Sequence, residues 1–403
     1  MGSVSLLERR IRTTVEHLRQ ELSSLLVRVF GDPRRPNDLV CRAGINRSLA
    51  SNLLRSIRAA DALEAAHLMP GPEALRCVLA VARQKGADDC LISRVGQAVH
   101  EFEQLVVHEL GALGGLQAVL SESLPEARRR LEAKSKQAIF TGFANIRGVS
   151  ADVYSVTYLG HPSRDAGRVD LAMIIGFAGL RRTRPGAVLR VSSRNLGPQL
   201  EYDQRLTLDG QSVHGLDGLV LGDYCSQPVP PVKAFRSGPT VEYVVANDAF
   251  GPDSAINLVF GELCIGVLPR FQRPGERRSS GVAAEIEQPA KLLVFDFLLH
   301  KEVWRECVPE LRVYDTVVRG TAHPNDPARD ADRLDLSESI ELVERGPRGT
   351  RIGSIPNYPE LLRDACSKLD WDIESFRVYR CRVQYPVYGS QVCMVFYPPE
   401  AGS

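Results

Sequence analysis

The sequence predicts a multi-domain α + β protein, with an all-α N-terminal region followed by a β-rich α+β C-terminal domain. Three observations support this prediction. A chain of 403 residues suggests two or three domains of about 100–200 residues each. As far as about residue 135, apolar residues recur every three or four positions, which is the helical period. From Ala138 onward, β-branched and aromatic residues form short runs bounded by Gly, Pro, Asn and Asp, which is typical of strands. We therefore expect domains over 1–135 and 136–403, the second large enough for two subdomains.

Residues 3–30 are expected to form one long helix, ended by Gly31-Asp32-Pro33. The apolar residues recur at a spacing close to a heptad repeat. This spacing leaves two interpretations open: a helix whose apolar side faces a core, or a seam between two copies of the chain. The residues that carry the spacing are Val4, Leu7, Ile11, Leu18, Leu22, Leu25 and Val29.

Further helices are expected as far as about residue 133. Pro70-Gly71-Pro72 precedes a helix over 73–86, Gly111 ends another over 91–110, and Pro125 opens a last one. Almost no strand pattern occurs in this third of the chain, so we expect it to be all-α.

Strand-like runs fill most of the remainder, with one helix over 359–370. No regular helices separate the strands, so a doubly wound α/β sheet is not expected. The segment 273–282 is expected to be an exposed, mobile loop tip. The predicted strands lie at 138–143, 152–159, 169–180, 187–193, 240–246, 256–268, 291–299, 311–318 and 382–397.

The segment LVCRAGINRSLASNLLRSIRA, residues 39–59, has the pattern of two short helices that meet at a corner. Gly44 suits the corner because glycine adopts a left-handed backbone without a Cβ penalty. Asn46 is a good N-cap for the second helix, which begins at Arg47. The residues predicted to pack the two helices together are Leu39, Val40, Ala43 and Ile45 near the corner and Ala50, Leu53 and Leu54 on the second helix.

Polar side chains occupy the other flank of the second helix, and such side chains donate hydrogen bonds to phosphates or base edges. The motif, at about 37–59, resembles the helix-turn-helix of bacterial transcription regulators. The resemblance implies that Arg47, Ser48, Ser51 and Asn52 face the major groove of DNA and that Arg42 and Arg55 reach phosphate. The predicted DNA-binding residues are Arg42, Asn46, Arg47, Ser48, Ser51, Asn52, Arg55 and Arg58.

One part of the motif departs from the family pattern. Such domains usually open with a helix capped by Gln or Thr, whereas here Pro36-Asn37-Asp38 precede a first helix of barely two turns. A structural or protein-binding helical hairpin therefore remains the alternative to DNA binding.

Charge is distributed unevenly along a chain whose formal net charge is +1. Residues 1–60 contain eleven Arg and five acidic residues, a net charge of +6, so the remainder carries −5. A basic head on a mildly acidic body fits a DNA-contacting module joined to another domain.

The nine cysteines form no CxxC pair, and their odd number is unlike a closed disulfide framework. We interpret most of them as small core residues in a reducing compartment. The N-terminus lacks the pattern of a signal peptide, and no apolar run approaches the length of about 18 residues that a membrane segment needs. These features predict a cytoplasmic protein.

The chain contains no GxxxxGK[ST] loop, no GxGxxG after a strand, no HExxH and no close Cys/His cluster. We therefore predict no cofactor, no metal site and no catalytic residue. The histidines are too scattered for a metal site: His100 and His108 are eight residues apart, and His161, His214, His300 and His323 are isolated.

Three other segments have weaker patterns. Asn325–Asp335 holds four Asp without the Gly and closing Glu of a calcium loop, so we interpret it as a solvated acidic loop with ion pairs, a cation site being the alternative. Gly179–Gly186 places three Arg between two strands, either as a solvated turn or as a contact for nucleic acid or an anionic ligand. Ser390, within Tyr388–Val392, is interpreted as part of a β-bulge or a hairpin turn beside a core strand, with a nucleophile as the alternative.

These observations favour a DNA-binding transcription regulator whose C-terminal domain senses a ligand or mediates oligomerisation. The expected partners are double-stranded DNA, a second copy of the chain in a homodimer, and an unidentified ligand or protein partner for the C-terminal domain; no membrane is expected. Two alternatives stay open. One is an enzyme in the C-terminal domain that uses the carboxylates at 326–335 and the arginines at 181–184, and the other is a self-assembling or partner-binding structural protein.

Overall fold

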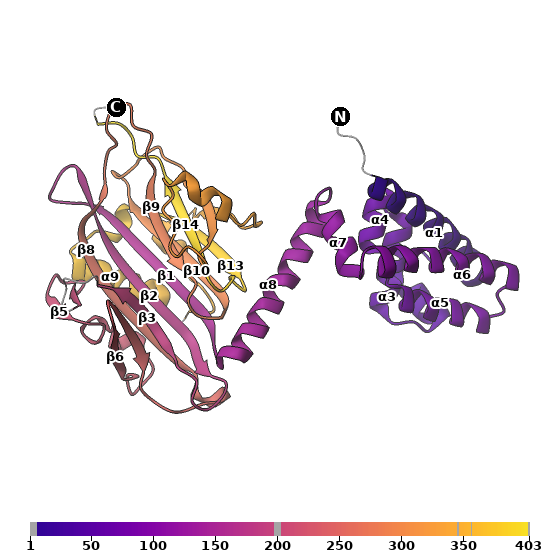
Figure 1. The fold of residues 1–403 in the computed structure, drawn as a ribbon, viewed down its shortest axis with the longest axis horizontal. Coiled ribbons are helices and arrows are strands. Elements are labelled where there is room, and N and C mark those ends of the chain that lie inside the picture. Colours follow the sequence, from indigo (N-terminus) through magenta and orange to yellow (C-terminus); the bar gives the residue numbers. More distant parts are fainter. Residues whose placement is uncertain (1–5, 197–202, 345, 356, 402–403) are drawn as a thin grey trace. The chain divides into compact units, whose positions relative to one another are not determined.

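The computed structural model describes residues 6–196, 203–344, 346–355 and 357–401. The chain divides into two compact units, Met1–Glu132 and Ala133–Ser403, which we call the helical unit and the β-rich unit. The predicted order of an all-α region followed by a β-rich region is confirmed (Figure 1).

Helices make up the described part of the helical unit. Residues 3–5 of the predicted first helix lie outside the described residues. The sixth helix continues directly into a π-helical turn, η1. The elements are α1 (Leu6–Phe30), α2 (Pro36–Ala43), α3 (Arg47–Arg58), α4 (Ala62–Leu68), α5 (Pro72–Gln84), α6 (Asp89–Glu103), η1 (Gln104–Glu109), α7 (Leu113–Ser121) and α8 (Pro125–Arg147), which continues into the β-rich unit.

The apolar side of α1 packs inside the helical unit. Ile11, Val15, Leu18, Leu22 and Leu25 are completely buried in a core that α4 and α6 share. The core-facing interpretation of this helix is therefore confirmed. The alternative of a seam between two copies is wrong for these residues, because side chains buried in their own chain's core leave no apolar surface for a partner.

The second half of α8 corrects the strand predicted at 138–143, where the helix continues without a break. Phe140 and Phe143 are three residues apart and so lie on one side of the helix. Phe140 contacts Tyr385 at a ring-centroid distance of 5.3 Å, and Phe143 stacks on Tyr388 at 4.1 Å. Tertiary packing of these rings outweighs the preference of aromatic residues for strands.

A six-stranded sheet forms the centre of the β-rich unit, in the order β12-β13-β10-β1-β2-β8. In this sheet β1 and β10 run parallel, and the other neighbouring pairs are antiparallel. The arrangement is not a doubly wound sheet. Its strands are β1 (Val149–Pro162), β2 (Arg168–Arg182), β8 (Ile256–Pro269), β10 (Ala290–His300), β12 (Ile340–Leu342) and β13 (Phe376–Gln384).

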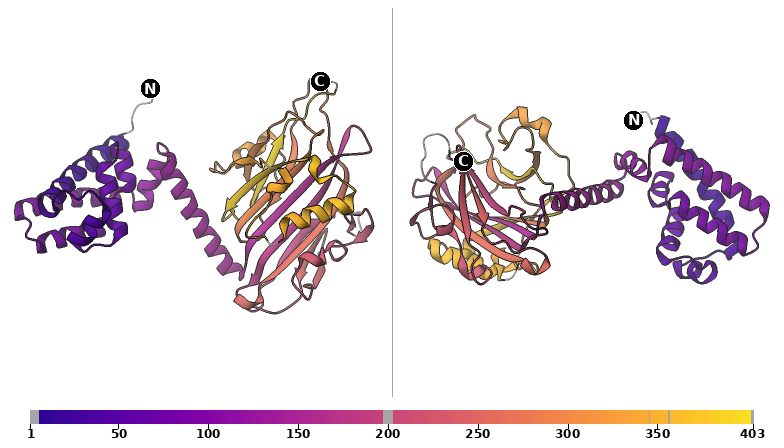
Figure 2. Two further views of the ribbon diagram at one scale, coloured as in Figure 1. Left: turned by 180° about the vertical axis from the view of Figure 1, so that it is seen from behind. Right: turned by 60° about the horizontal axis from the view of Figure 1, so that its bottom comes forward.

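The two faces of this sheet pack against different layers, because successive side chains of a strand point to opposite sides. Val153 and Leu159 of β1 pack against helix α9 (Tyr358–Leu369), which lies across one face in Figure 2. Tyr154 and Val156 belong to the core on the other face, which the smaller sheets share. The helix predicted at 359–370 is thus confirmed.

Three smaller sheets complete the described part of the β-rich unit, in the orders β11-β14-β9, β3-β7-β6 and β4-β5. Val282 and Met394 attach the first of them to the central sheet. The loop predicted at 273–282 is shorter than expected, because its last residues begin β9 and pair with β14. The strands are β3 (Arg190–Asn195), β4 (Gln204–Leu206), β5 (Ser212–His214), β6 (Val232–Ser237), β7 (Thr240–Val245), β9 (Ser280–Glu285), β11 (Glu310–Asp315) and β14 (Ser390–Phe396).

Candidate nucleic-acid interface

The corner of the motif lies at Gly44, directly after α2. Its backbone φ is +69°, and its N–H donates a hydrogen bond to the carbonyl oxygen of Val40 at 3.0 Å. A Cβ atom at Gly44 would meet no other atom within 4 Å. Backbone conformation, and not lack of space, therefore explains the glycine, and the predicted left-handed corner is confirmed.

Asn46 sets the start of α3. Its side-chain oxygen Oδ1 accepts a hydrogen bond from the Leu49 N–H at 2.7 Å. This is the N-cap arrangement, which satisfies a backbone donor that has no partner inside the helix, as the sequence predicted. The amide nitrogen of Asn46 has no protein partner among the described residues, and the side chain is exposed.

The apolar faces of α2 and α3 pack into the core of the helical unit. α1 and α4 cover this side of α3, so only its other flank is accessible. The inner-face residues predicted from the sequence are buried, with Val40 half-buried: Leu39, Ala43, Ile45, Ala50, Leu53 and Leu54.

Five predicted DNA-binding residues lie on the accessible flank of α3. Arg47, Ser48 and Arg55 are exposed, and Ser51 and Asn52 are half-buried. Within the part of the chain that the structure describes, none of these five side chains makes a hydrogen bond or a salt bridge. The structure therefore leaves them available for an external partner.

Two other predicted DNA-binding residues hold the chain that precedes the motif. Arg42 donates to the carbonyl oxygen of Gly31 at 2.9 Å. Arg58 donates to the carbonyl oxygens of Pro33 and Arg34, both at 2.8 Å. These bonds fix the segment between α1 and α2 against the motif. A phosphate bound by Arg42 or Arg58 would have to use the remaining guanidinium N–H groups or displace these backbone carbonyl oxygens.

The arginines of the motif form no salt bridges among the described residues, and Asp38 is the one carboxylate within the motif itself. None of its four arginines forms a salt bridge with a carboxylate in the described ranges, whereas three arginines of α1 do. The four arginines of the motif therefore keep their charge free of salt bridges, as do Arg9, Arg28, Arg34 and Arg35 elsewhere in the described N-terminal segment. The paired arginines are Arg10 with Glu109, Arg12 with Glu8 and Arg19 with Glu16.

The acidic segment Asn325–Asp335 is a structural turn with ion pairs. It contains a short 3-10 helix, and Asp326 caps the first turn of that helix. Arg329 is buried and forms a salt bridge with Asp332 at 2.7 Å. The ion-pair interpretation of this segment is confirmed.

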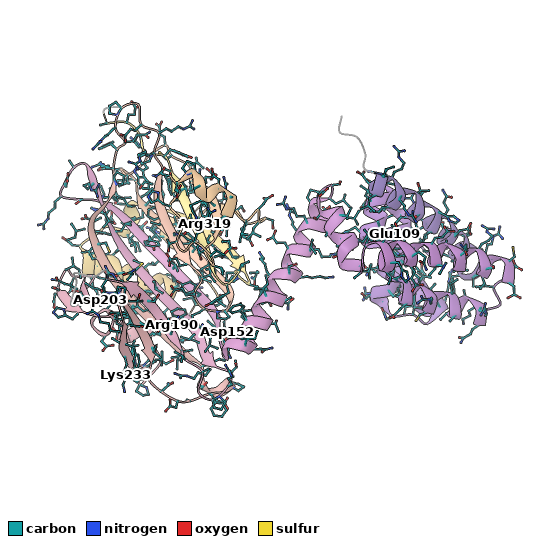
Figure 3. All side chains as sticks on the ribbon, viewed as in Figure 1. Glu109, Asp152, Arg190, Asp203, Lys233 and Arg319 are labelled. Atoms are coloured by element: carbon teal, nitrogen blue, oxygen red, sulfur yellow. The ribbon has the colours of Figure 1, made fainter. Side chains whose placement is uncertain are left out.

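The arginines of Gly179–Gly186 also bind protein groups. Arg182 is buried, and its guanidinium donates to two backbone carbonyl oxygens at 2.7 Å. Arg181 and Lys291 both form salt bridges with Asp152, which Figure 3 labels. Arg181, Arg182 and Asp332, which the enzyme alternative would use, are thus engaged in separate structural contacts.

Ser390 lies in a turn at the start of β14, directly after Gly389, whose φ is +75°. The Ser390 hydroxyl is buried and donates to the carbonyl oxygen of Val387 at 2.7 Å. The hairpin interpretation is wrong, because β13 belongs to the central sheet whereas β14 pairs with β11 and β9, so this turn connects two different sheets.

His161 and His300 are neighbours in the structure, although the sequence leaves them isolated. β1 and β10 pair in parallel and end at the same edge, which brings the two ring centroids to 4.8 Å. Burial, and then the nearby His161, lower the pKa of His300. Local sequence contains no signal for this pair, because strand register creates it. Among the described residues, no group of three or more His, Cys, Asp or Glu is arranged to hold a metal ion.

Comparison with protein-family models, curated proteins and solved structures found no match to this chain. Within the described ranges, no helix combines the length and apolar character needed to cross a membrane. Any functional assignment therefore depends on the contacts described above.

Proposed function

We propose that this protein is a DNA-binding transcription regulator that reads the major groove with the accessible flank of α3. The observation that carries the proposal is the division of α3 into a buried apolar side and a flank of five polar side chains without described protein partners. Such side chains donate to base edges and phosphates. A helix about 10–12 Å across fits a major groove about 12 Å wide.

The short first helix and the corner suit this use of α3. In helix-turn-helix proteins the first helix crosses the DNA backbone while the second enters the groove. Gly44 and Asn46 set the angle between α2 and α3, and Arg47 and Arg55 supply unpaired positive charge for phosphates. All nine cysteines are free thiols, which supports the proposal that the protein works in the cytoplasm.

The β-rich unit is proposed to sense a ligand or to build a homodimer. A dimer would double the DNA footprint, and a ligand that prefers one arrangement of the dimer would alter DNA affinity. The apolar side of α1 is buried, so the dimer contact must lie on another surface. Light scattering of the full chain at micromolar concentration tests the dimer, and a monomeric mass would remove it.

Fluorescence anisotropy of the full chain with a labelled duplex of about 30 base pairs tests DNA binding, since such a duplex spans two half-sites. The double variant Arg47→Ala with Ser51→Ala is expected to weaken binding at least about tenfold, because it removes one charge and one donor from the proposed surface. Arg83→Ala is the matched control, because Arg83 is an exposed arginine on α5, outside the motif.

Salt dependence separates this mode of binding from adventitious association. The slope of log affinity against log salt is expected to approach about −0.9 per phosphate contacted, and to become shallower in the double variant but not in Arg83→Ala. Duplexes selected from a random library should bind more tightly than a mixed sequence. If neither kind of duplex binds at low salt, the proposal of a DNA-binding regulator is wrong. A large assembly in light scattering would then favour the alternative of a self-assembling structural protein.

A further inference from the structure

A cavity of about 670 Å³ lies in the β-rich unit beside β9, an edge strand of the β11-β14-β9 sheet. The loop between β8 and β9 forms one wall, and residues 323–325 form another (β8, β9 and β14 are labelled in Figure 1). This volume falls within the range of sites for small organic molecules, about 300–1,000 Å³.

The loop wall of the cavity is tethered. Gln272 donates its N–H to the carbonyl oxygen of Pro399 at 2.9 Å. At the other end of the loop, Asn325 Oδ1 accepts from the Ser279 N–H at 2.7 Å, and Asn325 Nδ2 donates to the Ser279 carbonyl oxygen at 2.7 Å. The exposure predicted for this loop is confirmed, and hydrogen bonds hold both of its ends.

Positive charge dominates the lining of the cavity. Its described lining residues include three arginines, Arg168, Arg273 and Arg278, against one acidic residue, Glu276. The Oε1 atom of Glu276 lies 3.9 Å from a guanidinium nitrogen of Arg273, and both side chains are exposed. Such an exposed ion pair is weak and offsets little of the positive charge. The Arg278 guanidinium makes no hydrogen bond or salt bridge with any described residue. An anion in the cavity would therefore meet positive charge that the protein leaves uncompensated.

Gln391 adds a hydrogen-bond donor to the same cavity. The residue is only 3% exposed, and its Oε1 accepts a hydrogen bond from the Ala322 N–H at 2.8 Å. This bond fixes the orientation of the amide, and Nε2 then has no partner among the described residues. Because Gln391 lines the cavity, an oxygen atom of a ligand would satisfy the donor.

Apolar side chains form the remaining surface of the cavity. Val267, Leu268, Val282 and Met394 line it together with the arginines. A small inorganic ion would leave this apolar surface uncovered. The lining therefore suits a ligand that has both an anionic group and a carbon skeleton.

We propose that this cavity binds a small organic anion, a carboxylate or a phosphate ester with an apolar body. The arginines hold the anionic group, Gln391 donates to an oxygen of the ligand, and the apolar side chains cover the carbon skeleton. The inference rests on the proposed function in one respect, because it supplies the ligand that the β-rich unit would sense. Binding itself is measurable without DNA.

Isothermal titration calorimetry of the full chain with phenyl phosphate and with benzoate tests the proposal, and uncharged benzyl alcohol is the matched probe. At least one anion is expected to bind with a dissociation constant of about 1 mM or tighter, and benzyl alcohol at least about tenfold more weakly. The two anions distinguish a phosphate ligand from a carboxylate ligand. Absence of heat with both anions up to about 10 mM overturns the proposal.

Two variants locate the binding. Arg278→Gln removes an unpaired charge and is expected to weaken anion binding about tenfold, whereas Arg277→Gln, at a neighbouring arginine outside the lining, should change it less than about twofold. Gln391→Glu keeps the acceptor for Ala322 but replaces the donor with a carboxylate oxygen, so it should abolish binding. Equal affinities of wild type and Arg278→Gln overturn the assignment, even where Gln391→Glu fails to fold.

The outcome is separable from that of the proposed function. A chain that binds phenyl phosphate or benzoate but no duplex keeps this inference and removes the DNA proposal. A chain that binds duplex but neither anion keeps the DNA proposal and removes this inference. Where both bind, the anion is expected to change the duplex affinity of wild type but not of Arg278→Gln.

Discussion

Arg58 donates a hydrogen bond from its guanidinium to the carbonyl oxygen of Pro33 at 2.8 Å, so the last turn of α3 is tied to the segment that precedes α2. Arg55 lies one turn earlier on the same helix and makes no such bond within the described residues. The two exposed arginines therefore have separable roles, one in holding the motif and one at its accessible flank.

Arg58→Ala is expected to destabilise the motif by about 1 kcal/mol, because it removes two hydrogen bonds to backbone carbonyls. Hydrogen exchange measured by mass spectrometry should show faster exchange in peptides over 30–43. Arg55→Ala should leave hydrogen exchange unchanged. It should make the slope of log affinity against log salt shallower by about 0.9, the value for one phosphate contact. Equal exchange in the two variants would contradict the structural role of Arg58.

Gly44→Ala is expected to destabilise the helical unit by about 1 kcal/mol, because the residue must keep a φ of +69° while its Cβ meets no other atom. Gly96, in the middle of α6, is the matched control. Its Cβ also meets nothing within 4 Å, and its backbone is helical, so Gly96→Ala should stabilise by up to about 1 kcal/mol. Opposite shifts of the urea midpoint, followed by far-UV circular dichroism, check both expectations.

Asp296 and Arg380 form a completely buried pair between β10 and β13, with contacts of 2.8 and 2.6 Å. Asp296→Ala is expected to cost about 3–5 kcal/mol, because it leaves the guanidinium charge buried without a partner. Fluorescence of Trp304 and Trp371, both in the β-rich unit, reports the unfolding of that unit in urea.

The double replacement Asp296→Leu with Arg380→Met provides the control for this pair. It removes both charges together and should cost less than either single replacement. A double variant that is less stable than both single variants would show that the pair contributes net stability beyond the burial of its charges.

His300 makes the stability of the β-rich unit depend on pH. Its pKa is lowered from an ordinary value of 6.5, first by burial and then by the charge of His161, with Lys301 and Arg270 acting in the same direction and Glu302 opposing them. The unfolded chain therefore takes up this proton more readily than the folded chain. The contribution of His300 to the free energy of unfolding is complete above about pH 6.5, and it is lost as the pH falls towards the lowered pKa.

Urea unfolding at several pH values between about 5 and 8 measures this effect. His300→Gln should flatten the decline in stability on the acidic side. His214→Gln, at an exposed histidine of the same unit, should leave the decline unchanged. A decline that persists in His300→Gln would assign the pH dependence to other groups.

The corner of the motif could be predicted because its causes are local. Gly44 at a positive φ, Asn46 as the N-cap and the buried Ala50, Leu53 and Leu54 each follow from residue type and helical spacing within a few positions. The same reasoning was wrong at 138–143. The aromatic residues there suggested a strand, but packing of Phe140 and Phe143 against distant rings favours helix.

The sequence by itself determined the order of helices and strands, the corner at Gly44 and which flank of α3 is apolar, because these depend on the conformations and spacing of neighbouring residues. Only the tertiary structure decided that the apolar side of α1 is buried in the core of its own unit and that Arg58 donates to the carbonyl oxygen of Pro33. It also decided that the rings of His161 and His300 lie in contact and that Gln391 lines a cavity with three arginines. These relationships join residues far apart in the chain. Strand register and side-chain packing create them, and no local pattern encodes either.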